Sequence, residues 1–226
     1  MSSWWLRAAE RRVAVDPSLL SADFADLRGE MASLARAGAD MFHLDIMDGH
    51  FVPNLTFGPP VAAALRRRTD LPLAAHLMVE RPARLLDDFA EAGVDSITIH
   101  VEAADEPLAT LRAIGQRGMK RGLTLRPGTR LETVRPLLGE IDLLLIMSVE
   151  PGFGGQHFMP AALDRVAEAA AWRRGGNFGF AISVDGGVEG HNAADCRAAG
   201  ADILVSGTYL LHAANRAAAI RKLRGE

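Results

Sequence analysis

Residues 37–49 read AGADMFHLDIMDG and join the end of a predicted helix to a complete predicted strand. The first four letters recur as AGVD at 92–95 and as AGAD at 199–202. In each copy a helical pattern ends, the glycine can take the left-handed conformation that terminates a helix, and an apolar strand begins. The glycines are 55 and then 107 residues apart. These spacings are close to two and four units of about 27 residues, so eight units would nearly fill the chain.

Short apolar runs alternate with helical patterns throughout the chain. The predicted strands cover residues 13–16, 41–47, 72–78, 95–101, 121–125, 141–148, 180–185 and 203–206. One predicted helix carries an apolar stripe formed by Phe24, Leu27, Met31 and Leu34. Alternation of this kind implies parallel strands with right-handed crossovers. We expect an α/β fold, namely a single (β/α)8 TIM barrel over residues 13–226, with an open doubly wound sheet as the alternative. Residues 1–12 are expected to form a short N-terminal extension.

The composition argues against several classes of protein. The 226 residues carry 28 acidic and 25 basic side chains, for a net charge of -3, without the basic surplus that nucleic acid or an anionic membrane would favour. No apolar run approaches the 18 residues of a membrane span. The single cysteine cannot form an internal disulfide. A cytoplasmic protein is expected, with neither nucleic acid nor membrane as a partner.

Polar residues occupy the inward face of three predicted strands. In residues 41–47 the side chains alternate, so His43 and Asp45 lie opposite the apolar face that meets the helices. His76 and Asp185 occupy similar places in the strands 72–78 and 180–185. One such residue alone is more often a hydrogen-bonded core residue or a turn cap. Two imidazoles and two carboxylates converging at C-terminal strand ends favour a site for one divalent metal ion such as Zn²⁺, Fe²⁺, Mn²⁺ or Co²⁺.

Glycines follow the last three predicted strands. They lie in Pro151-Gly152-Phe153-Gly154-Gly155, in Asp185-Gly186-Gly187 and in Ser206-Gly207-Thr208. A glycine pair in a tight turn is common, but three such turns in the final units of a barrel favour an anion site built from backbone N–H groups, most often for a phosphate. Thr208 could add its hydroxyl to this site.

Other conspicuous residues have simpler interpretations. Met47, Met78 and Met147 lie near strand ends, where core packing is more common than an apolar lid over a metal site. Cys196 is expected to pack in the interior. The histidines expected to be solvated are His50, His157, His191 and His212.

Five segments together resemble the ribulose-phosphate 3-epimerase family. They are PSLLSADF (17–24), HLDIMDGHFVPNLTFGP (43–59), HLM (76–78), MSVEPGFGGQ (147–156) and VDGG (184–187). The resemblance runs from about residue 13 to the end. It implies a (β/α)8 barrel that interconverts D-ribulose 5-phosphate and D-xylulose 5-phosphate in pentose phosphate metabolism, with one divalent metal ion. The family often forms dimers or higher assemblies, so a homo-oligomer is expected.

The resemblance also implies a role for each matching residue. The metal ligands fall on His43, Asp45, His76 and Asp185, and the acid/base pair on Asp45 and Asp185. The implied substrate contacts are Ser18, His76, Gly152, Phe153, Gly154, Gly155, Asp185, Gly186, Gly187, Gly207 and Thr208. Two carboxylates on opposite faces of C3 can move a proton from one face to the other through a metal-stabilised ene-diolate.

Three positions depart from the pattern of the family. Asp16, Ser183 and Tyr209 stand where a small residue, a glutamate and a small residue are usual, respectively. Ser183 could weaken support of the metal, and Tyr209 could reshape the phosphate end. The same chemistry on another ketose phosphate, such as D-allulose 6-phosphate, is therefore the alternative.

Two other classes of protein fit the sequence less well. Decarboxylation or aldol chemistry is disfavoured because the sequence has no Asp-x-Lys-x-x-Asp array and only two lysines, Lys120 and Lys222, neither of them near a C-terminal strand end. A non-catalytic sugar-phosphate or metal-binding protein is disfavoured because both acid/base carboxylates are present.

Overall fold

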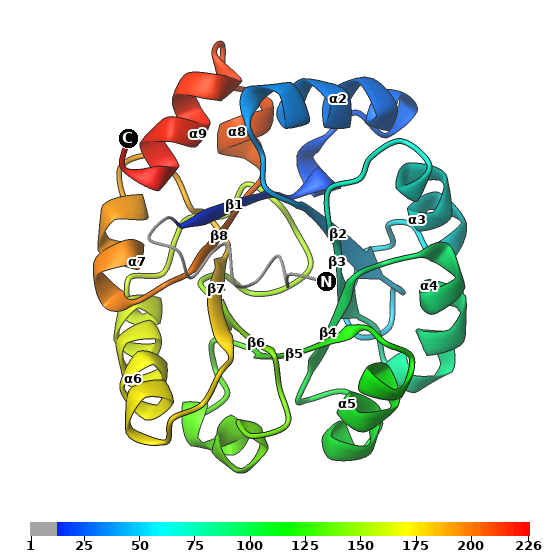
Figure 1. The fold of residues 1–226 in the computed structure, drawn as a ribbon, viewed down its shortest axis with the longest axis vertical. Coiled ribbons are helices and arrows are strands. Elements are labelled where there is room, and N and C mark those ends of the chain that lie inside the picture. Colours follow the sequence, from blue (N-terminus) through cyan, green and yellow to red (C-terminus); the bar gives the residue numbers. More distant parts are fainter. Residues whose placement is uncertain (1–12) are drawn as a thin grey trace.

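The computed structural model describes residues 13–226, which fold into a ring of parallel strands surrounded by helices (Figure 1). The strands are β1 (Ala14–Pro17), β2 (Phe42–Met47), β3 (Leu73–Met78), β4 (Ser96–His100), β5 (Lys120–Leu125), β6 (Leu143–Met147), β7 (Ala181–Asp185) and β8 (Ile203–Ser206). All eight predicted strands are therefore confirmed, with ends that shift by at most two residues.

The helices that cover the ring follow the strands in turn. The α-helices are α2 (Leu27–Ala37), α3 (Pro59–Arg66), α4 (Leu86–Ala92), α5 (Pro107–Gln116), α6 (Ala161–Gly175), α7 (Ala193–Ala199), α8 (Thr208–Leu211) and α9 (Arg216–Arg224). Shorter 3₁₀ segments are η1 (Leu19–Ser21), η2 (Phe24–Asp26), η3 (Pro82–Leu85) and η4 (Leu131–Leu137). After β5 the chain forms only η4, which contains Pro136, a residue with no N–H to donate to a helix.

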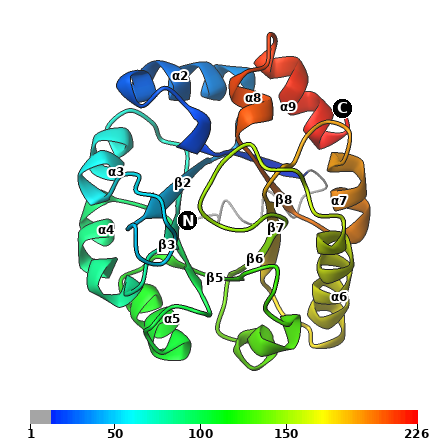
Figure 2. The same cartoon turned by 180° about the vertical axis from the view of Figure 1, so that it is seen from behind.

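The strand order shows that the sheet closes into a barrel. The order is β1-β8-β7-β6-β5-β4-β3-β2, with parallel pairing at every step. A parallel bridge between Ser18 and His43 joins the two ends of this sheet, and the view from behind shows the same ring (Figure 2). The fold is a (β/α)8 barrel, and the open doubly wound sheet is excluded.

The pleat of β2 follows the predicted alternation. Leu44 and Ile46 are buried in the layer between strands and helices, whereas His43 and Asp45 are buried inside the ring. The apolar stripe predicted for the first helix is correct for Met31 and Leu34, which are buried. It is wrong for Phe24, which lies in η2 before the helix, is 46% exposed and contacts Phe57 edge-on.

The internal repeat has a structural cause at the N-terminal end of the barrel. Its aspartates lie just before β2, β4 and β8, and each one accepts a hydrogen bond from a backbone N–H in the first two residues of the preceding strand: Asp40 from Val15, Asp95 from Leu73 and Asp202 from Ile182. A fourth carboxylate, Asp142, does the same for Arg121, although its surrounding sequence does not match the repeat. The two-unit spacing therefore reflects four equivalent clamps between odd and even strands.

An arginine pairs with each of these carboxylates. The pairs are Arg224 with Asp40, Arg66 with Asp95, Arg121 with Asp142, and Arg173 with Asp202. A carboxylate that binds both a guanidinium and a strand N–H satisfies two donors at once. We infer that this end of the barrel contributes to stability.

The predicted extension over residues 1–12 lies outside the described residues. Among the helices of residues 13–226, none is long and apolar enough to cross a membrane.

The clamps predict a pH-dependent contribution to stability. Burial alone would raise the pKa of Asp142, but the hydrogen bonds from Arg121 lower this pKa below its ordinary value of 3.8. Its contribution is therefore present above about pH 4 and is lost as the pH falls through the lowered pKa. We expect Asp142→Ala to reduce the free energy of unfolding at pH 7 by about 1–3 kcal/mol.

Urea unfolding of both chains at pH 7 and pH 3 measures this effect. The exposed Asp70 is the control, and Asp70→Ala should change stability by less than about 0.5 kcal/mol. A loss for Asp142→Ala that is equally large at pH 3 would contradict a role for the ionised carboxylate.

Candidate functional site

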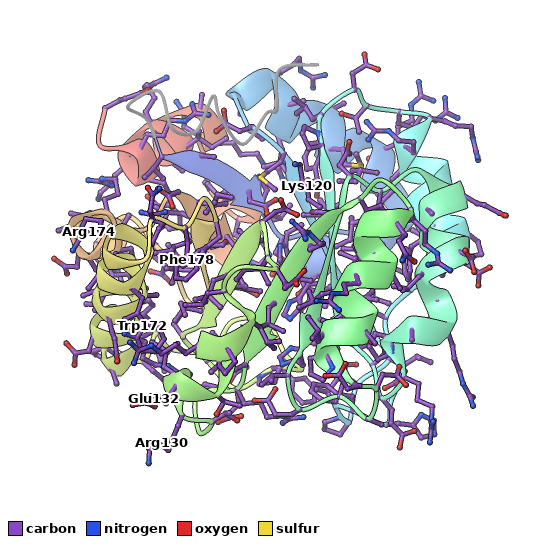
Figure 3. The ribbon with its side chains drawn as sticks, turned by 60° about the horizontal axis from the view of Figure 1, so that its bottom comes forward. Lys120, Arg130, Glu132, Trp172, Arg174 and Phe178 are labelled. Atoms are coloured by element: carbon purple, nitrogen blue, oxygen red, sulfur yellow. The ribbon has the colours of Figure 1, made fainter. Side chains whose placement is uncertain are left out.

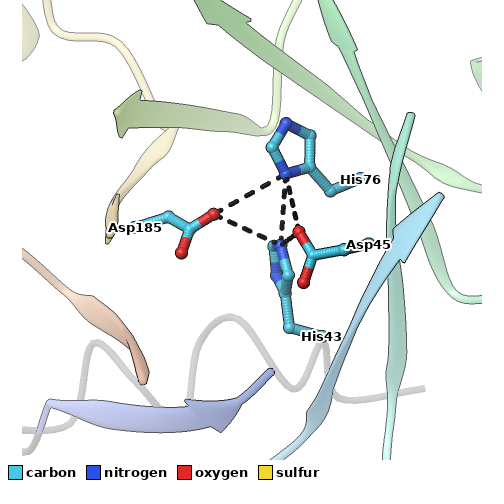
Figure 4. Close-up of side chains that lie close together, drawn as sticks. All are labelled: His43, Asp45, His76 and Asp185. Carbon is cyan, nitrogen blue, oxygen red and sulfur yellow. Dashed lines mark hydrogen bonds and ion pairs between the residues drawn. The ribbon is translucent and has the colours of Figure 1, made fainter. Parts of the chain in front are cut away.

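Four ionisable side chains from three strands meet at one point inside the barrel (Figure 4). β2 contributes His43 and Asp45, β3 contributes His76, and the end of β7 contributes Asp185. One nitrogen or oxygen atom of each residue lies within 4.8 Å of those of the other three. Nε2 of His43 is 3.3 Å from Nδ1 of His76, 3.5 Å from Oδ1 of Asp45 and 3.7 Å from Oδ2 of Asp185. The structure thus brings together all four residues predicted from strand phasing.

Hydrogen bonds behind the cluster orient two of its members. Oδ2 of the buried Asp16 lies 3.2 Å from Nδ1 of His43. A proton on this Nδ1 leaves Nε2 with a lone pair directed into the cluster when the ring is neutral. The Ser18 hydroxyl donates to Oδ2 of Asp45 at 2.6 Å, which turns Oδ1 towards the two histidines.

Two residues near His76 were not predicted from the sequence. His100, at the end of β4, is fully buried, and its Nε2 lies 2.9 Å from Nε2 of His76. Glu102 faces the other nitrogen of His100, with 3.4 Å between Oε2 and Nδ1. Strand phasing could have found His100, because it shares the inward face of β4 with Thr98. Asp16 was noted only as a departure from the family pattern.

Burial and close charges shift the pKa values in the cluster in opposite directions. Burial and the neighbouring Asp45 raise the pKa of Asp185 to about 7. Burial lowers the pKa of His76 to about 4. Burial would also lower the pKa of His43, but Asp45 and Asp16 raise it well above the ordinary value. The same attraction between His43 and Asp45 lowers the pKa of Asp45 despite its burial.

The donor set fits a divalent cation. Two imidazole nitrogens and two carboxylate oxygens form a mixed N/O set, which borderline first-row metals accept. With both rings neutral and both carboxylates ionised the cluster carries two negative charges, which one divalent ion would balance. Such closely packed acceptors repel one another unless a proton or a cation lies between them. The cluster could therefore hold one metal ion, whose identity these residues leave open.

An open cleft leads from the C-terminal face of the barrel to the cluster. Ser18, Asp45 and Asp185 line its base. The other predicted substrate contacts that line it are Gly152, Phe153, Gly154, Gly155, Gly186, Gly187, Gly207 and Thr208. His76 is the exception, because it is fully buried below the cleft. The three glycine turns predicted from sequence thus converge on one cleft.

The glycines after β7 are required by close packing. Gly186 and Gly187 have positive φ angles of 117° and 62°, a region that disfavours residues with a Cβ. A Cβ at Gly187 would lie 2.6 Å from the backbone nitrogen of Phe158. The loop between β6 and α6, yellow-green in Figure 2, therefore packs directly on the turn after β7. Asn54 ties this loop to the loop after β2 by donating to the Gly152 carbonyl at 2.9 Å.

Tyr209 contacts Gly190, since a Cβ at that glycine would lie 2.4 Å from the tyrosine hydroxyl. Tyr209 also borders the cleft. Ser183 is buried in β7.

The three strand-end methionines, Met47, Met78 and Met147, are buried and line the cleft, so they combine packing with a place beside the cluster.

The remaining predictions on single residues are confirmed. Cys196 is buried, and burial raises the pKa of its thiol to about 11. The four histidines predicted to be solvated are exposed: His50, His157, His191 and His212.

The lysines lie away from the cluster. Lys120 begins β5, and Figure 3 shows it at the opposite end of the barrel from Arg130 and Glu132, which follow the C-terminal end of that strand. Lys222 lies in α9. Among residues 13–226 no lysine lines the cleft.

Comparison with known proteins identifies the family of the chain. The model of the ribulose-phosphate 3 epimerase family matches residues 14–211. The chain belongs to this family. A ribulose-phosphate 3-epimerase of Rhodospirillum rubrum is 49% identical over 218 residues, covering 95% of this chain and 94% of the relative. One of Bacillus subtilis (strain 168) is 42% identical over 214 residues, with 94% and 99% covered. The family assigns the chain to the epimerases, within the isomerase class.

Solved structures with the same fold are more distant. A 3-keto-L-gulonate-6-phosphate decarboxylase from Vibrio cholerae superposes with a TM-score of 0.70 at 17% identity, covering 94% of this chain and 97% of that chain. A 3-hexulose-6-phosphate synthase superposes with a TM-score of 0.66, also at 17% identity, with 94% and 98% covered. These similarities support the barrel and carry no information about the reaction.

The raised pKa of Asp185 predicts a destabilising effect in the metal-free protein. Between the ordinary value of 3.8 and about 7, the unfolded chain loses a proton that the folded chain retains. The contribution of Asp185 to stability therefore declines as the pH rises through this window. We expect Asp185→Asn to be more stable than the parent chain at pH 8, with the difference shrinking towards pH 4.

Urea unfolding in the presence of a chelator measures this difference. Addition of Zn²⁺ should favour the parent chain, because an ion that binds only the folded state stabilises it. A difference between the two chains that does not vary with pH would contradict the assignment of this titration to Asp185.

Proposed function

We propose that this chain interconverts D-ribulose 5-phosphate and D-xylulose 5-phosphate by moving the proton on C3. One observation carries the proposal. The carboxylates of Asp45 and Asp185 come from strands on different sides of the barrel and face each other across the cluster at the base of the cleft (Figure 4). Inversion of C3 requires a base on one face of the carbon and an acid on the other.

Asp45 and Asp185 would exchange these roles between the two directions of the reaction. The carboxylate that removes the C3 proton becomes protonated, and the other carboxyl group delivers a proton to the opposite face. The two groups start from unequal proton affinities, since the pKa of Asp185 is about 7 and that of Asp45 is lowered. One ionised base and one protonated acid are thus available together near neutral pH in the metal-free site, with the pair titrating as a unit.

His43, Asp45, His76 and Asp185 would hold one divalent metal ion. When bound, the ion would act as a Lewis acid for the negative charge that develops on the substrate oxygens, an effect worth several kcal/mol. Ser18 and Asp16 hold Asp45 and His43 in the required orientation through the hydrogen bonds described above.

The far end of the cleft would bind the phosphate group. Backbone N–H groups in the turns at 152–155, 186–187 and 207–208 suit an anion. The hydroxyls of Ser21 and Thr208 are 3.1 Å apart at this end, and each could donate to a phosphate oxygen. Binding of the phosphate here would place the carbon chain of the sugar above the two carboxylates.

Proton NMR of D-ribulose 5-phosphate in D₂O tests the reaction and the metal together. We expect loss of the C3 proton signal with formation of xylulose 5-phosphate. A chelator should stop the exchange, and added Zn²⁺, Fe²⁺, Mn²⁺ or Co²⁺ should restore it. The folded, metal-loaded protein could instead leave the C3 proton of D-ribulose 5-phosphate unexchanged and exchange the C3 proton of D-allulose 6-phosphate. In that case the substrate is the longer ketose phosphate.

Substitution of either carboxylate tests the two-base mechanism. We expect Asp45→Asn and Asp185→Asn each to lower the rate of epimerisation by about 10²–10⁴-fold, because each removes one proton-transfer group. Binding of inorganic phosphate, measured by calorimetry, should be retained, and Asp70→Asn should leave the rate unchanged. Epimerisation at the parent rate by Asp185→Asn, with metal content confirmed, would refute the mechanism.

A further inference from the structure

His100 contacts Nε2 of His76, the ring nitrogen that does not face the cluster. It is fully buried at the end of β4, where its ring packs 4.8 Å from that of Phe51. The only hydrogen bond of its side chain among residues 13–226 is the 2.9 Å contact between its Nε2 and Nε2 of His76. Two neutral imidazoles can share such a contact only if one nitrogen is protonated and the other is not.

Glu102 determines which nitrogen carries the proton. Oε1 of Glu102 accepts hydrogen bonds from the Arg126 N–H at 2.8 Å and from the Thr129 hydroxyl. Oε2 makes no hydrogen bond within the described part of the chain and faces Nδ1 of His100 at 3.4 Å. Although burial opposes ionisation, these donors and His100 lower the pKa of Glu102 to about 2. An ionised carboxylate can only accept, so Nδ1 of His100 is the protonated nitrogen.

The protonated nitrogen of each ring then follows from Glu102 through His100 to His76. With its proton on Nδ1, a neutral His100 presents a bare Nε2 to His76. His76 must donate from its own Nε2, and its Nδ1 is left with a lone pair. That Nδ1 is the atom 3.3 Å from Nε2 of His43 and 3.4 Å from Oδ1 of Asp45.

We propose that His100 and Glu102 are positioning residues that hold His76 in the tautomer with a free Nδ1, and thereby set the affinity of the cluster for a divalent metal ion. The proposal rests on the metal site of the proposed function. Neither residue lines the cleft, so neither touches substrate. Partners that fix the tautomer of a metal-binding histidine are worth about 10–100-fold in metal affinity.

Two substitutions of similar size distinguish a positioning role of His100 from a role in core packing. His100→Gln can place an amide oxygen near the position of Nε2 and accept the His76 proton. His100→Phe fills the space without an acceptor. We expect the dissociation constant for Co²⁺ or Zn²⁺, measured by calorimetry on metal-stripped protein, to rise about 10–100-fold in His100→Phe. It should stay close to the parent value in His100→Gln, and the visible spectrum of bound Co²⁺ should change in the phenylalanine variant alone.

A measurement on the unsubstituted, metal-free chain keeps the test independent of folding defects. Long-range ¹H–¹⁵N correlation spectra of protein labelled at histidine distinguish the two neutral tautomers. We expect a proton on Nε2 of His76 and on Nδ1 of His100. A proton on Nδ1 of His76, or equal metal affinity in the two variants, would overturn the proposal. Because neither readout involves turnover, failure to epimerise ribulose 5-phosphate would reject the proposed reaction without affecting this result.

Discussion

The register between β2 and β3 is the constraint on which the site depends. Asp45 pairs with His76, so these two residues lie at the same height, and His43, one inward position below at the level of Ala74, reaches them with its Nε2 3.3 Å from Nδ1 of His76. A shift of one residue in β2 would turn His43 and Asp45 towards the helices and bring Leu44 and Ile46 inside. The apolar side chains of the strand therefore fix the site indirectly, because burying Leu44 and Ile46 under the helices leaves one possible phase.

Much of the fold and of the cluster was predictable, since both follow from periodicity. Alternation at two residues gave the inward face of each strand, and the repeated helix–strand junction gave the number of units. The predictions were weaker where geometry depends on residues far apart in sequence. Asp16 and His43 are 27 residues apart and His76 and His100 are 24 apart, and strand phasing alone does not show which inward residues touch.

Local conformations that break periodicity were also missed. Phe24 fits a helical stripe by spacing, yet the chain forms a 3₁₀ turn there because Asp23 and Asp26 accept backbone N–H groups and start separate segments. Asp142 was not predicted because it lacks the sequence motif of the repeat. It performs the same task as the aspartates of the repeat, but the residues before it differ from theirs, so the shared structure has no shared motif.

The four aspartate clamps divide the barrel into equal quarters. Each clamp joins the start of an even strand to the start of the odd strand before it, so β1–β2, β3–β4, β5–β6 and β7–β8 each contain a complete clamp. Among residues 13–226 none of these four carboxylate–N–H bonds crosses from one quarter to the next, whereas Arg224, Arg66 and Arg173 reach their aspartates from a helix of the neighbouring quarter. A gene fragment encoding two strands and their helices could therefore be duplicated, exchanged or moved to the other terminus with its carboxylate–N–H bond intact, provided that a neighbouring quarter still supplies the arginine. A break inside a quarter would instead separate the carboxylate from its strand. Fragment complementation and circular permutation of this barrel should thus be best tolerated at boundaries between quarters.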